Sequence, residues 1–186
     1  MKAPNAHDAH LVETRVSSEQ VYRGKLLDVR RDVVRLPDGK TATREYIVHP
    51  GAVLVVPVLD DGRLVVERQF RYPLGCVMLE FPAGKIDPGE SPLVTGKREL
   101  MEEAGYTAAT WTPLGRVHTV VSYSTEAIEF FVAEGLSHEG AKLDDGEFLE
   151  IDEMSVDAML AALDRGEITD VKTVAALLMY VRRRGR

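Results

Sequence analysis

The sequence has only one cysteine, Cys76, and no long apolar run. A single cysteine cannot form an intramolecular disulfide, which fits the reducing cytoplasm. The longest apolar stretch, residues 52–59, is far shorter than the roughly 20 residues that a membrane-spanning helix requires. The N-terminal ten residues are polar and contain no hydrophobic signal core. We therefore expect a cytoplasmic protein with no membrane partner.

The sequence also lacks an excess of positive charge. The 186 residues include 23 Lys and Arg against 30 Asp and Glu, a formal net charge of −7 at pH 7. This balance argues against a nucleic-acid backbone as a partner, although phosphate chemistry remains open if cations intervene. The sequence contains no internal repeat and no low-complexity segment. Its length and its hydrophobic content of 45% suit one globular domain with a small addition.

Turn motifs and apolar patterns predict a strand-rich protein with a few helices. Two stretches, residues 28–49 and 52–69, each place an Asp-Gly dipeptide between two strand-like segments and predict hairpins. This mixture predicts an α/β sandwich with a mixed sheet, preceded by a disordered tail over residues 1–12. Further strands are expected at residues 77–81, 114–121, 127–133 and 148–154, and helices at residues 92–104, 156–164 and 170–183.

The most informative segment, residues 84–106, is a glycine-rich turn followed by a helix. Ser91 is a suitable N-cap, and Pro92 falls at the first helical position, where its missing N–H costs nothing. Gly105 suits the position just after the helix. An apolar arc of this helix is expected to be buried, and it consists of Leu93, Leu100 and Ala104.

Three carboxylates, those of Glu99, Glu102 and Glu103, share an arc of about 100° on this helix. A Glu-rich helix face is often simply solvated, and this alternative applies to the helix taken alone. Like charges three and four residues apart are, however, unfavourable without a counter-ion. Hard oxygen ligands favour Mg²⁺, which Mn²⁺ can replace, over zinc. The helix therefore suggests a magnesium site that bridges carboxylates to substrate phosphates.

The whole segment resembles the signature of the Nudix hydrolases, with the spacing G-x5-E-x7-R-E-L-x-E-E-x-G. Only the last position departs, because Tyr106 stands where an aliphatic residue is usual. The resemblance implies catalytic roles for Glu90, Arg98 and Glu102, the first two by bracing the loop against the helix. The metal ligands that it implies are the backbone carbonyl of Ala83 and the side chains of Glu99, Glu102 and Glu103.

The resemblance also implies an architecture. Residues 51–186 would form a Nudix-type α/β/α sandwich with a mixed sheet, and this would be the catalytic domain. Residues 13–50 would form a small N-terminal β subdomain. In ADP-ribose pyrophosphatases such a subdomain helps to build the dimer, so a homodimer is expected.

Three further segments resemble the ADP-ribose pyrophosphatases of this family. Residues 80–84 read E-F-P-A-G, residues 67–73 contain E-x-Q-F-R, and residues 166–173 read G-x-I-x-D-x-K-T. One loop departs from the subgroup, because residues 120–126 lack the proline and glycine of its S-P-G-x-x-x-E pattern but keep Glu126. ADP-sugars, GDP-mannose and other nucleotide sugars therefore stay open as substrates.

Five residues outside the signature receive roles by this resemblance. Arg71 would clamp a substrate phosphate with its guanidinium fork. Glu126 would be the general base or an additional metal ligand, and Glu80 would contact the substrate or brace the loop. Arg44 could meet the adenine or the second subunit, and Tyr123 could line the ribose pocket. The alternative for each is an ordinary surface or strand residue.

These observations predict Mg²⁺-dependent hydrolysis of the pyrophosphate bond of a nucleoside diphosphate sugar. The expected substrate is ADP-ribose, which would give AMP and ribose 5-phosphate. A catalytically silent nucleotide-binding module is a second hypothesis, but such modules tend to lose signature carboxylates, and this chain keeps all of them. A third hypothesis is hydrolysis of dinucleotide polyphosphates or oxidised nucleotides, and the E-F-P-A-G segment argues against it.

Overall fold

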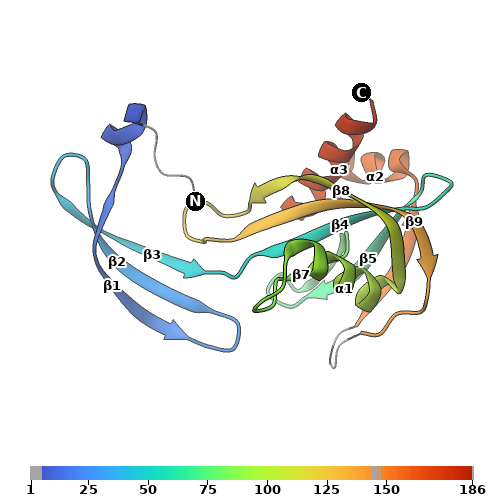
Figure 1. The fold of residues 1–186 in the computed structure, drawn as a ribbon, viewed down its shortest axis with the longest axis horizontal. Coiled ribbons are helices and arrows are strands. Elements are labelled where there is room, and N and C mark those ends of the chain that lie inside the picture. Colours follow the sequence, from blue (N-terminus) through green and yellow to red (C-terminus); the bar gives the residue numbers. More distant parts are fainter. Residues whose placement is uncertain (1–5, 144–145, 147, 186) are drawn as a thin grey trace. The chain divides into compact units, whose positions relative to one another are not determined.

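The computed structural model describes residues 6–143, 146 and 148–185, and it divides the chain into two compact units. The first, here called the N-terminal unit, contains the chain up to His49 together with Val120–Glu126. The second, the sandwich unit, contains Pro50–Thr119 and Ala127–Arg186. Figure 1 shows the elements of each unit in the order of the chain.

The N-terminal unit is built on a three-stranded antiparallel sheet in the order β1-β2-β3. Its strands are β1 (Thr14–Arg23), β2 (Asp28–Arg35) and β3 (Thr41–Val48), so the predicted first hairpin is confirmed. Before the sheet, Ala6–Leu11 form a short 3₁₀ helix where the sequence suggested a tail without structure. The rest of that predicted tail, residues 1–5, lies outside the described residues.

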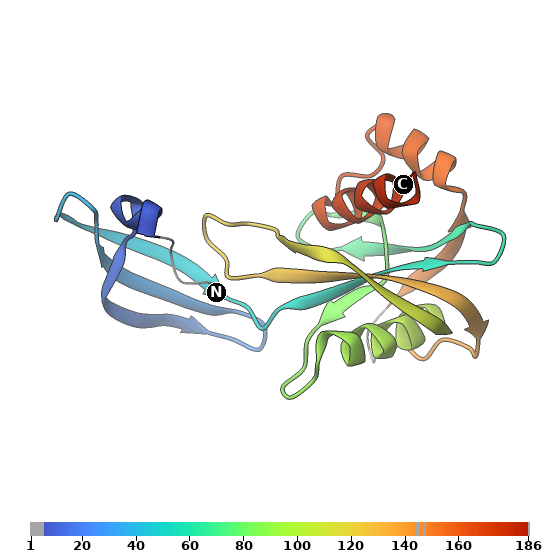
Figure 2. The same ribbon diagram turned by 45° about the horizontal axis from the view of Figure 1, so that its top comes forward.

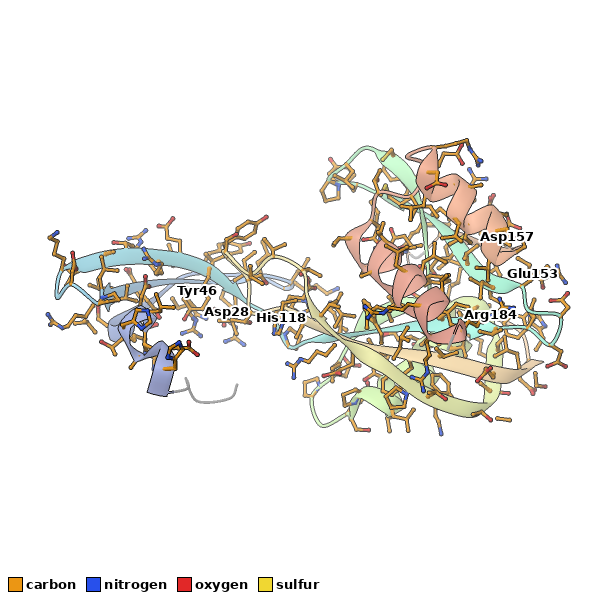
Figure 3. The ribbon with its side chains drawn as sticks, turned by 90° about the horizontal axis from the view of Figure 1, so that it is seen from above. Asp28, Tyr46, His118, Glu153, Asp157 and Arg184 are labelled. Atoms are coloured by element: carbon orange, nitrogen blue, oxygen red, sulfur yellow. The ribbon has the colours of Figure 1, made fainter. Side chains whose placement is uncertain are left out.

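This sheet buries little of its own surface. All ten residues of β1 are exposed, while Asp32 and Val34 on β2 are buried. The Tyr46 hydroxyl donates a hydrogen bond to Asp32 Oδ2 at 3.1 Å, and Figure 3 shows Tyr46 among the side chains of this sheet. Burial, together with the nearby Asp32 carboxylate, raises the pKa of Tyr46.

The sandwich unit contains a seven-stranded mixed sheet in the order β10-β5-β4-β9-β8, with β6 paired to β5 and β7 paired to β4. The central strands β4 and β9 run parallel, and the other pairs are antiparallel. The predicted mixed sheet is therefore confirmed. The strands are β4 (Ala52–Val58), β5 (Leu64–Arg71), β6 (Cys76–Glu80), β7 (Ala83–Lys85), β8 (Tyr106–His118), β9 (Ala127–His138) and β10 (Leu149–Met154).

Helices cover both faces of this sheet. Helix α1 (Pro92–Ala104) lies on one face, and α2 (Val156–Asp164) and α3 (Val171–Arg184) lie on the other, as Figures 1 and 2 show. The predicted α/β/α sandwich is thus confirmed. Within the described ranges, no helix combines the length and the apolarity needed to cross a membrane.

Strand β4 explains why the core has two halves. All seven of its residues are buried, and successive side chains point to opposite faces. Leu54 and Val56 belong to the cluster beneath α2 and α3, whereas Val53 and Val55 belong to the cluster beneath α1. A strand covered on both faces is expected to be continuously apolar, which is how residues 52–59 read in the sequence.

Helix α1 has the predicted bounds and caps. The Ser91 hydroxyl accepts a hydrogen bond from the backbone N–H of Val94 at 3.4 Å, and Gly105 ends the helix with φ 73°. The predicted buried stripe is wrong in one respect, because Leu93 is 37% exposed. Leu100 and Ala104 are buried as predicted. The helix also buries Thr95, Gly96 and two of its acids, Glu99 and Glu103.

Gly96 lets α1 pack closely against the sheet. A Cβ at this position would lie 3.1 Å from Val53 Cγ1 and 3.4 Å from Trp111 Cζ3. The close neighbours are therefore side chains of the sheet. The loss of helix propensity at this glycine, about 1 kcal/mol relative to alanine, is compatible with the close fit that it permits.

Candidate active site

The acidic face of α1 packs against the turn that β7 forms. Strand β7 is held by pairing with β4, where Ala83 lies opposite Leu54. The backbone N–H of Ala83 donates a hydrogen bond to Glu103 Oε2 at 2.9 Å. A Cβ on Gly84 would stand only 1.7 Å from Glu99 Oε1, so only glycine allows this carboxylate to approach the backbone. Glu99 and Glu103 are consequently just 8% and 5% exposed.

Arg98 connects the loop to the helix and serves as the counter-ion of the acids. Its Nη1 lies 2.9 Å from Glu99 Oε1 and 2.8 Å from Glu102 Oε2. Its Nε and Nη2 each donate to a separate oxygen of Glu90 at 3.1 Å, and Nη2 also donates to the carbonyl of Lys85 at 3.2 Å. One guanidinium thus partly neutralises three carboxylates.

The electrostatics of Glu90 follow from this contact. The hydrogen bonds from Arg98, and then that from the Thr95 hydroxyl at 2.7 Å, lower the pKa of Glu90 from 4.5 to about 2. The hydrogen bonds of Arg98 to Glu90, and then to Glu102, raise the pKa of Arg98 above its ordinary value. Glu90 therefore stays ionised across the physiological range and holds the loop to Arg98.

We expect Glu90 to contribute to acid stability in a defined window. Because its pKa is lower in the folded state, its contribution is complete above pH 4.5 and is lost as the pH falls from 4.5 toward 2. Glu90→Gln should lower stability at pH 7 and flatten its decline within this window. Urea unfolding from pH 7 to pH 2.5 measures both effects.

Glu150→Gln, at an exposed acid of the same unit, is the matched control and should unfold like the wild type at every pH. If Glu90→Gln and the wild type lost stability in parallel between pH 4.5 and 2.5, the role assigned to the Glu90–Arg98 pair would be contradicted.

The donor atoms around the Ala83–Gly84 turn suit a hard divalent cation. They are carboxylate oxygens of α1 and backbone carbonyls of the turn, and no soft ligand is among them. In the part of the chain that the structure describes, no three acidic, histidine or cysteine side chains already surround a common point. Arg98 Nη1 instead lies between Glu99 and Glu102, so the guanidinium supplies the positive charge there.

Arg71 and Glu80 form a second cluster in the sandwich unit. Arg71 Nε donates to Glu80 Oε1 and Nη2 donates to Oε2, both at 2.7 Å, in a bidentate pair. Glu80 is 1% exposed. The hydrogen bonds to Glu80 raise the pKa of Arg71, and the negative charge of Glu103 on α1 acts in the same direction. The guanidinium is thus within electrostatic reach of the acidic helix.

Three of the predicted site residues lie in the N-terminal unit. Arg44 Nε donates to Glu13 Oε2 at 3.0 Å. Tyr123 is 53% exposed. Glu126 Oε1 lies 3.5 Å from His49 Nε2. The residues brought together in the sandwich unit are Ala83, Glu90, Arg98, Glu99, Glu102 and Glu103 at the turn, and Arg71 with Glu80 beside them in β5 and β6.

Sequence reasoning gave no individual role to four residues that the structure places at these clusters. Thr95 contacts Glu90. Asp170, Lys172 and Thr173 surround the Glu80 side of the second cluster. The signal for the last three was their presence in residues 166–173, one of the segments that resemble ADP-ribose pyrophosphatases, but that similarity did not say what they contact.

Comparison with known families agrees with this fold and site. The chain matches the NUDIX domain over residues 48–177 and the nucleoside diphosphate sugar hydrolase N-terminal domain over residues 13–47. The first match spans more than half of the chain and contains every signature residue. The chain therefore belongs to the Nudix family and is a Nudix hydrolase, as the spacing of its acids predicted.

Individual relatives extend this comparison along most of the chain. An ADP-ribose pyrophosphatase of Bacillus subtilis is 40% identical over 169 residues, which cover 90% of this chain and 91% of the relative. A methanol dehydrogenase activator of Bacillus methanolicus is 38% identical and covers 89% and 90%. The crystal structure of an ADP compounds hydrolase superimposes with a TM-score of 0.82 at 28% identity and covers 91% and 92%.

Proposed function

We propose that this Nudix hydrolase cleaves the pyrophosphate bond of ADP-ribose and releases AMP and ribose 5-phosphate. The observation that carries the reaction is the packing of two signature glutamates, Glu99 and Glu103, against the Ala83–Gly84 turn. Arg98 joins Glu102 to Glu99, and Arg71 is within electrostatic reach. The choice of substrate is supported by the similarity to an ADP-ribose pyrophosphatase over 90% of the chain.

We infer that Mg²⁺, replaceable by Mn²⁺, is the cofactor. The residues that would hold it are Glu99, Glu102 and Glu103, together with the backbone carbonyl of Ala83. When bound, a divalent cation there would offset the charge of the pyrophosphate and lower the pKa of a coordinated water. The oxygen-only donor set supports this choice over zinc.

The chain's own groups then have distinct tasks. Arg71 binds a substrate phosphate through its guanidinium, and Arg98 and Glu90 hold the loop to α1 while the substrate is bound. Glu126, or one of the signature glutamates, would accept the proton of the attacking water. The water oxygen bonds to one phosphorus, the bridging P–O bond breaks, and the departing phosphate keeps the bonding electron pair. This displacement requires no covalent intermediate with the enzyme.

The N-terminal unit supplies the remaining proposed roles. Arg44 would meet the adenine or a second subunit, and Tyr123 would line the ribose pocket. We propose that the unit supports a homodimer, since residues 13–47 match the N-terminal domain of nucleoside diphosphate sugar hydrolases. We propose that the protein acts in the cytoplasm, whose reducing conditions suit its single cysteine.

A substrate panel with Mg²⁺ tests the proposed function. ADP-ribose, ADP-glucose, GDP-mannose, NADH and diadenosine polyphosphates are supplied in turn, and released AMP or GMP is quantified. We expect the highest kcat/KM for ADP-ribose. Preference for GDP-mannose would instead support the alternative that stays open because the loop at residues 120–126 departs from the ADP-ribose pattern. Activity confined to dinucleotides, or none on any compound, would refute the proposal.

A further inference from the structure

Asp170, Lys172 and Thr173 at the start of α3 contact the same carboxylate that holds Arg71. Lys172 Nζ forms an ion pair with Glu80 Oε2, across 92 positions of the sequence, and donates to Asp170 Oδ2 at 2.9 Å. Asp170 is the N-cap of α3, and its Oδ2 also accepts hydrogen bonds from the Thr173 backbone N–H at 3.0 Å and the Thr173 hydroxyl at 2.7 Å. The helix cap therefore fixes the lysine.

Charges alternate along this chain of contacts. Asp170 is followed by Lys172, then Glu80, and finally Arg71. The side-chain exposure is 19% for Asp170, 14% for Lys172, 2% for Glu80 and 38% for Arg71. The side chains near the helix are thus mostly buried, whereas Arg71 at the other end is partly exposed. Arg71 is the residue proposed to bind the substrate phosphate.

The surroundings of Glu80 explain why its buried carboxylate contacts two cations, Arg71 and Lys172. Glu80 lies directly opposite Glu67 in the pairing of β6 with β5, and Glu67 is also fully buried. Like charges opposite each other on neighbouring strands destabilise a sheet. Burial opposes ionisation of Glu80, but the hydrogen bonds from Arg71 and the charge and hydrogen bond of Lys172 outweigh it and lower its pKa.

We propose that Lys172 is a positioning residue that acts on the substrate through Glu80 and Arg71. Lys172 supplies a second positive charge to the buried Glu80 carboxylate, which Arg71 contacts through Nε and Nη2. Among the described residues Nη1 of Arg71 makes no hydrogen bond, and it stays available for a phosphate oxygen. Without Lys172, the acids would draw the guanidinium inward. This inference rests on the proposed pyrophosphatase function.

The same part of α3 also supports the turn that carries the proposed metal ligands. The Thr173 hydroxyl accepts a hydrogen bond from the backbone N–H of Phe81 at 3.3 Å, and Thr173 is completely buried. Phe81 is two residues before Ala83, whose N–H contacts Glu103. Changing Lys172 leaves this contact in place, so its effect should appear at Arg71 and should spare the turn.

The experiment is a double-mutant cycle with the best substrate of the panel. Lys172→Met should raise KM roughly 10-fold and leave kcat within about 3-fold, because the lost effect is on phosphate binding. Lys172→Arg should restore most of the lost affinity. In an Arg71→Ala background, Lys172→Met should change KM less than about 2-fold, since the residue through which it acts is absent. Lys40→Met, at an exposed lysine of the N-terminal hairpin, is the matched control.

A loss of the same size in both backgrounds would overturn the proposal and show that Lys172 supports only the fold. A second readout needs no turnover. The Arg71 Nε–H signal in a ¹H–¹⁵N spectrum should exchange with water more slowly in Lys172→Met than in the wild type, because Nε donates to the buried Glu80 that then holds Arg71 alone. An unchanged exchange rate would also overturn the proposal. If the wild type hydrolysed nothing in the panel, the proposed function would fail while this spectrum still tested the positioning role.

Discussion

Glu103→Gln is expected to lower kcat on the order of 10³-fold, about 4 kcal/mol of transition-state stabilisation, at saturating Mg²⁺. Glu103 is a proposed metal ligand, and the variant replaces a charged oxygen with a neutral amide of the same shape. The fold should survive, because the amide oxygen can still accept the hydrogen bond from the Ala83 N–H, which is 2.9 Å from Glu103 Oε2. Removing one of several neighbouring negative charges also relieves repulsion.

Three measurements separate a lost ligand from a lost structure. Steady-state kinetics give kcat, urea unfolding without metal should stay within about 1 kcal/mol of the wild type, and titration with Mn²⁺ should show weakened binding. Glu150→Gln, at an exposed acid of β10, is the matched control and should retain full activity. Wild-type turnover by Glu103→Gln would refute the assignment of Glu103 as a metal ligand.

Gly84→Ala should cost about 10²-fold in kcat/KM, although it adds only one methyl group. The new Cβ would stand 1.7 Å from Glu99 Oε1 and 1.9 Å from Glu99 Cδ, so the carboxylate must move away from the turn. The group that must move is the end of a flexible side chain. We therefore expect the variant to fold, with the proposed metal ligand Glu99 displaced from the turn. Kinetics at increasing Mg²⁺ should show a higher metal requirement.

Gly185→Ala is the control for this substitution. Its φ is −82°, and its added Cβ would meet only the Val181 carbonyl at 3.8 Å, so activity should be unchanged. A Gly84→Ala variant with wild-type kinetics and metal requirement would show that the close approach of Glu99 to the turn does not matter for catalysis.

The elements that local chemistry defines were predictable from the sequence. Helices α1 and α2 have the predicted bounds, because Ser91 and Ser155 cap them and Gly105 ends the first. Strands β8 and β9 are longer than predicted, at 13 and 12 residues. The additional residues of the two strands pair with each other, and their sequence shows little apolar alternation from which a strand could be predicted. Strand β7, three residues with a central glycine, lies where the sequence predicts a glycine-rich turn, and it forms because β4 pairs with it.

The candidate site, like the fold, was predictable only where local sequence determines it. Spacing along one helix identified its three acids, but it did not indicate that Glu99 and Glu103 are buried, because their burial depends on the β7 turn. The contact between Glu80 and Lys172 joins residues 92 positions apart, and no local pattern encodes such a contact. The roles of Arg44, Tyr123 and Glu126 stay predictions that rest on resemblance.

The guanidinium of Arg98 gives the acidic helix an internal substitute for a metal ion. In small zinc domains the bound metal supplies the folding energy, and chelators unfold them. Here Arg98 already joins Glu90, Glu99 and Glu102, so the polypeptide can complete its fold before it acquires a cation. Removal of divalent cations by a chelator should therefore leave the protein folded, unlike such a zinc domain.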